Sequence, residues 1–154
     1  MSKASERLKE LGITLPPPPR PVAAYIPFVK HGDVLYLSGQ IPTVEGKVQF
    51  EGQAGFKKTL EEAAQAARLC TINAISVAAD GAGGIDNIAR VLKVVVYVAS
   101  HEGFTDQSKV ANGASELLVQ VFGDAGKHAR AAVGVAELPL NSTVEVDVTF
   151  VVKA

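Results

Sequence analysis

Residues 129–147, ARAAVGVAELPLNSTVEVD, alternate small and β-branched residues on either side of a proline-containing turn. Such alternation predicts two antiparallel strands that form a hairpin. Pairing Leu138 with Thr143 across the turn would place Arg130 opposite Val151, about six residues and roughly 20 Å from Glu145. We therefore expect Arg130 and Glu145 not to meet within one chain.

Arg130 is a lone cation among alanine and valine residues in the first of these strands. A guanidinium stays charged at every physiological pH and presents a rigid fork of donors that fits a carboxylate or a phosphate. Two roles suit such a residue: a structural ion pair, or an anchor for an anionic ligand. The rest of the chain bears on the choice between them.

The remaining pattern is typical of an α+β protein. Apolar residues recur at helical spacing over 56–79 and from Thr105 or Asp106 to Gly123, which predicts two long amphipathic helices. Runs of β-branched residues predict strands over 23–29, 34–38 and 88–99, of which the first two form a hairpin. Before the strands we expect a short helix from Ser5 to Leu11 and a stiff polyproline tether over 16–21, and between the hairpin and the first long helix a loop over 43–55. Residues 1–21 are thus an N-terminal helix and tether, and residues 22–154 a single domain.

Two helices beside five strands predict a mixed sheet with both helices on one face. No segment remains to cover the other face, which suggests that further copies of the chain do so and that the protein is a homo-oligomer. On this uncovered face the alternation places the following residues of the last three strands: Arg130, Ala132, Gly134, Ala136, Glu145, Asp147, Thr149, Val91, Val95 and Tyr97.

The composition excludes several classes of protein. Fifteen basic side chains nearly balance sixteen acidic ones, so nothing in the charge favours nucleic acid or an anionic membrane surface. The one cysteine, Cys70, lies in a helical pattern and is expected to pack in the core. No apolar run reaches the length of a membrane span or a signal sequence, and we expect a cytoplasmic protein.

Several segments resemble signature segments of the RidA family, the reactive intermediate deaminases also called YjgF proteins. They are Ser38-Gly39-Gln40-Ile41-Pro42, Ala129-Arg130-Ala131-Ala132-Val133, Leu138-Pro139 and Val144-Glu145-Val146, together with Tyr25 and Asn112. The likeness spans about residues 22 to 152. It implies the chorismate-mutase-like fold and a homotrimer in which the sheets form a central barrel, with three sites between subunits.

The resemblance also implies a reaction. Deaminating members hydrolyse enamines and imines such as 2-aminoacrylate to a 2-keto acid and ammonia, without a cofactor or a metal. Carried over by motif, Arg130 would bind the substrate carboxylate, and Glu145 of a neighbouring chain would orient water or relay its proton. Backbone groups of Gly39 and Ala132 would hold the reacting end, Tyr25 and Ser38 would wall the pocket, and Asn112 would support it.

Ala132 departs from the family pattern, because many deaminating members carry a cysteine at that position. Alanine is compatible with activity if the position acts through its main chain, and incompatible if a thiol is required. A regulatory trimer that binds carboxylates or keto acids without turnover is therefore one alternative. An endoribonuclease or translation inhibitor, an activity long attached to the family, is another, although the near-neutral charge argues against it.

The histidines form no metal-ligand spacing, because His31, His101 and His128 lie in different loops or element ends. His128 stands out, since it precedes Arg130 by two residues, although a turn or rim position is its simpler interpretation. Ser115 shows no nucleophile motif with any of them.

Overall fold

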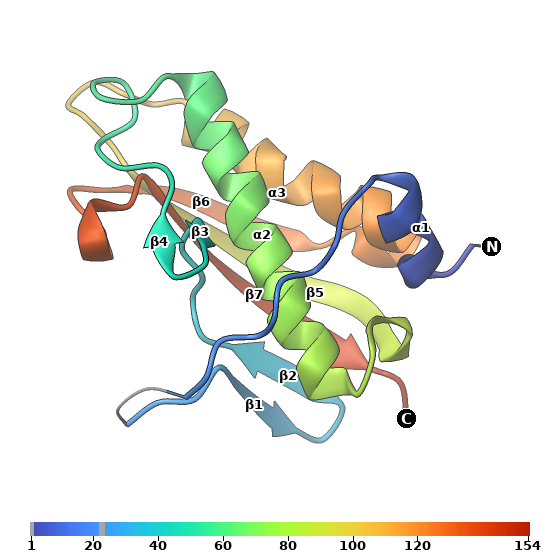
Figure 1. Ribbon diagram of the computed structural model, residues 1–154. Coiled ribbons are helices and arrows are strands. Elements are labelled where there is room, and N and C mark those ends of the chain that lie inside the picture. Colours follow the sequence, from blue (N-terminus) through green and yellow to red (C-terminus); the bar gives the residue numbers. More distant parts are fainter. Residues whose placement is uncertain (1, 22–23) are drawn as a thin grey trace.

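The computed structural model describes residues 2–21 and 24–154 and shows an α+β fold with a mixed five-stranded sheet. Two long helices lie side by side over one face of this sheet (Figure 1). The helices are α1 (Ala4–Glu10), α2 (Leu60–Ala82) and α3 (Gln107–Phe122), and the strands are β1 (Phe28–His31), β2 (Val34–Leu37), β3 (Thr43–Val44), β4 (Lys47–Val48), β5 (Ile88–Ala99), β6 (Ala129–Val135) and β7 (Val144–Val152). Within the described residues, no helix is long and apolar enough to cross a lipid bilayer.

The order of the strands corrects the predicted closing hairpin. The sheet runs β1-β2-β7-β5-β6, so β5 lies between β6 and β7 and pairs with both. β6 is parallel to β5, as expected for two strands joined by the helix α3, and β7 is antiparallel to β5. The connection from β6 to β7 is not a tight hairpin turn, because β5 lies between the two strands; it spans residues 136–143, and Leu140 and Asn141 in it adopt positive φ.

The register of β6 also corrects the predicted faces of the sheet. Arg130, Ala132 and Gly134 pair with Val94, Val96 and Val98, whose side chains are buried beneath the helices. Because paired residues point to the same side of a sheet, these β6 residues lie on the covered face and not on the open one. A bulge between Val91 and Lys93 moves Val91 to the covered face as well.

The open face carries a different set of residues. Within residues 2–21 and 24–154, no helix lies over it (Figure 1). By register its residues are Val29, Tyr36, Lys93, Val95, Tyr97, Ala129, Ala131, Val133, Glu145, Asp147 and Thr149. Val29 and Tyr36 are about half exposed, at 53% and 51%. Glu145, Asp147 and Thr149 were placed correctly from the sequence.

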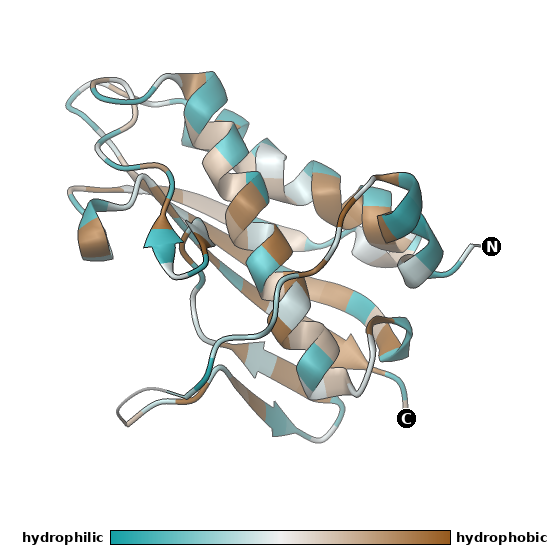
Figure 2. Cartoon of the chain, in the orientation of Figure 1, coloured by the Kyte–Doolittle hydropathy of each residue, from teal (hydrophilic) through white to brown (hydrophobic). Residues whose placement is uncertain are grey.

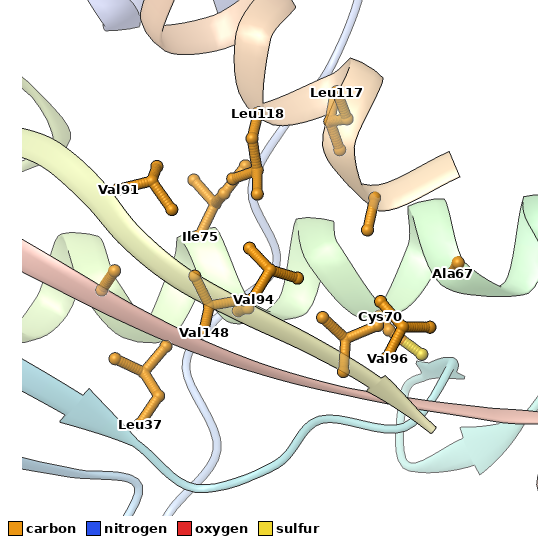
Figure 3. Packing of buried hydrophobic residues seen from close by; sticks show 14 of the residues in the cluster. Leu37, Ala67, Cys70, Ile75, Val91, Val94, Val96, Leu117, Leu118 and Val148 are labelled. Carbon is orange, nitrogen blue, oxygen red and sulfur yellow. The ribbon is translucent and has the colours of Figure 1, made fainter. Parts of the chain in front are cut away.

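The core forms between the covered face and the two long helices. Figure 3 shows Ile75 and Cys70 of α2 and Leu117 of α3 pointing toward the valines of β5 and β7. Cys70 is fully buried, which confirms its predicted place, and burial raises the pKa of its thiol. Brown residues follow the central strands in Figure 2, whereas loops and outer helix turns carry teal. The apolar stripe predicted for α3 is buried throughout.

The ends of several elements differ from the prediction. α2 begins at Leu60 and not near residue 56, because the Thr59 hydroxyl accepts from the Glu62 amide and the Glu62 carboxylate returns a bond to the Thr59 amide. β1 begins at Phe28, and Ala23, its predicted first residue, lies outside the described residues. The predicted loop over 43–55 contains the small hairpin of β3 and β4.

The N-terminal segment packs along the helices. Lys3 and not Ser5 is the N-cap of α1, and Ser5 instead binds Asp86 through its amide and its hydroxyl. These two bonds hold the pKa of Asp86 below its usual value. From α1 the chain runs across α2 toward β1 (Figure 1), and the Ser76 hydroxyl of α2 donates to the carbonyl of Pro16.

Candidate functional site

Arg130 lies at the edge of the sheet, on the covered side, where α3 passes over β6. Its Nη1 donates to Asn112 Oδ1 at 2.8 Å and to Ser115 Oγ at 3.2 Å, and its Nη2 donates to the carbonyl of Ser108 at 3.2 Å. Asn112 and Ser115 are three residues apart and Ser108 is one turn earlier, so all three share one face of α3. The helix therefore holds the guanidinium from one side.

This arrangement leaves one edge of the guanidinium available. The three bonds use both hydrogens of Nη1 and one of Nη2, and no described residue accepts from Nε. Nε and one hydrogen of Nη2 thus remain, and donors on these two nitrogens can bind both oxygens of a carboxylate. Arg130 is also exposed to solvent. An ion pair with an acidic residue, the structural role considered from the sequence, is absent among the described residues.

Ala132, the next residue of β6 on the same face, is half-buried and packs against the core. Its side chain offers no group that could react. Any contribution to chemistry at this position must come from its backbone.

A second group of the predicted residues lies on the other side of the sheet. Glu145 points from β7 to the open face, and its carboxylate lies over Gly39, where a side-chain Cβ would come within 3.0 Å of Glu145 Cδ. Paired amide bonds between Gln40 and Val146 fix this segment beside β7. A side chain at position 39 would therefore press on the Glu145 side chain and shift it by a few tenths of an ångström.

Ser38 connects the same segment to the chain near Tyr25. Its hydroxyl donates to the carbonyl of Ile26 at 2.6 Å, and its amide donates to the carbonyl of Pro27 at 2.8 Å. Tyr25, immediately before Ile26, is 63% exposed. Tyr25, Ser38, Gly39 and Glu145 are therefore parts of one surface region.

The two carboxylates of this region have altered acidity. Burial raises the pKa of Glu145, and the neighbouring Asp147 carboxylate raises it further. Burial also raises the pKa of Asp147. A glutamate whose pKa is shifted toward neutrality is better suited to exchange a proton with water than an ordinary surface glutamate.

The chain holds its two groups of site residues apart. Arg130 and Glu145 are two strands apart and about three residues apart along the strands, which corresponds to roughly 14 Å between their Cα atoms. Their side chains also point to opposite faces of the sheet. The hairpin from which we predicted their separation was wrong, but the separation itself holds.

Two residues that contact the Arg130 cluster were not predicted as site residues. Ser115 Oγ lies 2.9 Å from His128 Nε2, and His128 Nδ1 lies 2.6 Å from the carbonyl of Gly126. The sequence contained a partial signal, because Ser115 follows Asn112 by three residues and His128 precedes Arg130 by two. Without knowing that α3 lies over β6, these two spacings could not be combined.

Comparison with known proteins bears on the identity of this fold. Residues 5–151 match the family model described as "YjgF/chorismate_mutase-like, putative endoribonuclease". The chain belongs to the YjgF/RidA family.

Relatives of this YjgF/RidA protein differ in what is stated of them. Protein TCP17 of Trypanosoma cruzi is 42% identical over 146 residues, covering 94% of this chain and 91% of the relative. A 2-iminobutanoate/2-iminopropanoate deaminase of Dermatophagoides farinae is 29% identical over 148 residues, covering 92% of this chain and 95% of that one. A crystal structure of a "putative endoribonuclease" from Shewanella oneidensis superposes with a TM-score of 0.94 at 31% identity, over 98% of this chain and 100% of that chain.

Proposed function

We propose that this protein hydrolyses reactive enamines and imines of the 2-aminoacrylate type to 2-keto acids and ammonia. The observation that carries the proposal is the Arg130 guanidinium, which α3 holds by three bonds while its Nε and Nη2 edge stays available. The substrates of this reaction and its keto-acid products all carry a carboxylate next to the reacting carbon. The deaminase from Dermatophagoides farinae, to which the chain is similar along nearly its whole length, supports the same reaction.

We further propose that the active form is a homotrimer whose sheets form a central barrel. The open face of the sheet supports this assembly, because it mixes half-exposed apolar side chains with the carboxylates of Glu145 and Asp147. The separation of Arg130 from Glu145 supports sites between subunits, in which Arg130 of one copy acts together with Glu145 of the next.

In this mechanism Arg130 binds the substrate carboxylate through two parallel hydrogen bonds and fixes the position of the adjacent C2 carbon. Backbone groups of Gly39 and Ala132 hold the nitrogen-bearing end, and Tyr25 and Ser38 wall the pocket. Asn112 keeps the guanidinium in place. Substrate binding thus depends on both groups of residues.

Glu145 acts on the water molecule. The enamine first gains a proton at its methylene carbon and loses one from its nitrogen, which gives the imine. A water oxygen then bonds to C2 while Glu145 accepts a proton from that water and passes it to the nitrogen. The C2–N bond breaks as the hydroxyl on C2 gives up its proton and the nitrogen takes it up and leaves as ammonia, so that C2 becomes the carbonyl of the keto acid. Each turnover consumes one water, and its oxygen ends in the product.

Replacing Arg130 tests this proposal directly. We expect Arg130→Ala to lower kcat/KM for 2-iminopropanoate by about 100-fold or more, because a bidentate charge-assisted contact is lost. Arg130→Lys keeps the charge but not the fork, so it should restore only a small part of the activity. The assay follows decay of 2-aminoacrylate generated in situ, together with ammonia release.

Arg68→Ala is the matched control, since this arginine lies on α2 and is not hydrogen-bonded to Arg130, Asn112 or Ser115, and it should leave the rate unchanged. A wild-type protein that does not accelerate the decay would overturn the proposed activity.

A regulatory carboxylate-binding trimer is the second candidate, and Ala132 is the observation that favours it. Its methyl group packs against the core and supplies no thiol. Binding of pyruvate to the wild type with no turnover of 2-iminopropanoate would establish this alternative.

A further inference from the structure

The Arg130 cluster continues beyond the residues that touch the guanidinium. Ser115 Oγ contacts both Arg130 Nη1 and His128 Nε2, and His128 Nδ1 contacts the carbonyl of Gly126. Four groups from α3, β6 and the turn between them therefore form one continuous series of hydrogen bonds.

The direction of each bond follows from chemistry. A carbonyl can only accept, so His128 Nδ1 must carry the hydrogen that bonds to Gly126. In the neutral ring Nε2 is then bare, and it accepts the hydroxyl hydrogen of Ser115. The lone pairs of Ser115 remain for the Nη1 hydrogen of Arg130. The series is thus satisfied throughout by a neutral His128 with its hydrogen on Nδ1.

This series ends on rigid backbone. Gly126 is buried, and a Cβ there would overlap the carbonyl of Leu118, so the turn packs directly on α3. Ser115 and His128 are themselves half-buried. Asn112, by contrast, is exposed, and its side chain makes no other hydrogen bond among the described residues. Ser115 is therefore the side-chain partner through which the exposed Arg130 is tied to the packed interior.

We propose that Ser115 and His128 are positioning residues that aim the Nε and Nη2 edge of Arg130 at the substrate carboxylate. The proposal rests on the proposed function, since it assigns these residues to the same site. Arginine has several rotatable bonds, and a guanidinium that can turn about them meets a carboxylate with both donors only part of the time. Fixing Nη1 from behind removes that freedom, and a carboxylate is bound more tightly as a result.

Single substitutions give a first test. Ser115→Ala removes a hydrogen bond to the charged guanidinium, and His128→Ala removes the partner that fixes the Ser115 hydroxyl. Each should weaken pyruvate binding and raise KM for 2-iminopropanoate by about tenfold. The kcat at saturating substrate should change much less, because water activation by Glu145 is untouched. Ser115→Thr keeps the hydroxyl and should restore most of the affinity. Lys9→Ala, which alters an exposed residue of α1, is the control.

The double variant separates positioning from general damage to the fold. Ser115 and His128 act in series on one guanidinium, so Ser115→Ala/His128→Ala should bind pyruvate about as weakly as either single variant. Two independent losses of packing would instead add. Long-range ¹H–¹⁵N spectra of the wild type should show a protonated Nδ1 and a bare Nε2 for His128.

The outcomes distinguish this proposal from the proposed function. A wild type that neither binds pyruvate nor hydrolyses 2-iminopropanoate would overturn both. A wild type that binds pyruvate, with equal affinity in Ser115→Ala and His128→Ala, would overturn the positioning role alone. A ring with its one hydrogen on Nε2 and a bare Nδ1 would also overturn it, because His128 could then no longer donate to the carbonyl of Gly126.

Discussion

Glu145 couples the stability of the fold to pH, because burial and Asp147 raise its pKa in the folded chain. A carboxyl group with a raised pKa holds its proton more tightly in the folded than in the unfolded state. Its stabilising contribution is complete below the unfolded pKa of about 4.3 and is lost as the pH rises through the folded pKa. Above that pH the half-buried charge opposes folding.

We therefore expect Glu145→Gln to melt at a higher temperature than the wild type at pH 7, and at nearly the same temperature at pH 3, where the glutamate is protonated. Thermal unfolding followed by circular dichroism at both pH values measures the difference. Glu61→Gln, on the exposed side of α2, is the control and should show no such pH dependence. Glu145→Gln melting below the wild type at pH 7 would contradict the prediction.

Individual residues also show how far sequence patterns reach. Arg130 can be recognised as a candidate site residue from the sequence, because a cation among small apolar residues needs a binding partner. Its contact with Asn112 agrees with the supporting role that the family resemblance implies for Asn112. Ser115 and His128 carry no such signal on their own, since serine and histidine are common on helix and turn surfaces. Their meaning depends on the packing of α3 over β6, which lies outside any local pattern.

Among the helices and strands, the close packing of α2 against α3 depends on Gly113. A Cβ at this position would overlap the carbonyl oxygen of Ala64 in α2, and backbone cannot move aside as a side chain can. We expect Gly113→Ala to lower the free energy of unfolding by about 1–3 kcal/mol through overpacking. In an exposed helix the same change would stabilise by about 1 kcal/mol, so the sign of the effect is informative.

Urea denaturation measures this effect, and Gly81→Ala in the same helix pair is the matched control. A Cβ at position 81 would meet the flexible end of Leu35 at 2.9 Å, so this substitution should cost less. Equal stability of Gly113→Ala and the wild type would show that the helices can separate without cost.

Local sequence patterns predict the positions of helices and strands along the chain far better than they predict the order of the strands in the sheet. The strand over 88–99 and the buried stripe of α3 follow from periodicity, and the structure confirms both. The pairing partners of β6 do not follow from periodicity, because two strands that are consecutive along the chain can pair directly or can have a third strand between them. The predicted hairpin was the simplest solution, and inserting β5 between β6 and β7 turned Arg130 to the covered face.

The whole molecule presents its candidate site in two halves, Arg130 under α3 and Glu145 on the open face. If a complete site joins Arg130 of one subunit to Glu145 of the next, two inactive variants should complement each other. Random assembly of equal amounts of Arg130→Ala and Glu145→Gln leaves about three quarters of the trimers mixed. Each mixed ring has one junction at which both residues are intact, so about one site in four is complete.

We therefore expect coexpressed Arg130→Ala and Glu145→Gln chains to recover about a quarter of the wild-type rate of 2-iminopropanoate hydrolysis, whereas each variant alone is nearly inactive. Coexpressed Arg130→Ala and Arg130→Gln chains are the control, since no junction between them has an intact arginine. Light scattering on the same samples should give a mass near three times the 16.1 kDa of one chain. A mixture no more active than its separate variants would place both residues of each site in one subunit, which the sheet between them makes difficult, or would remove Glu145 from the reaction altogether.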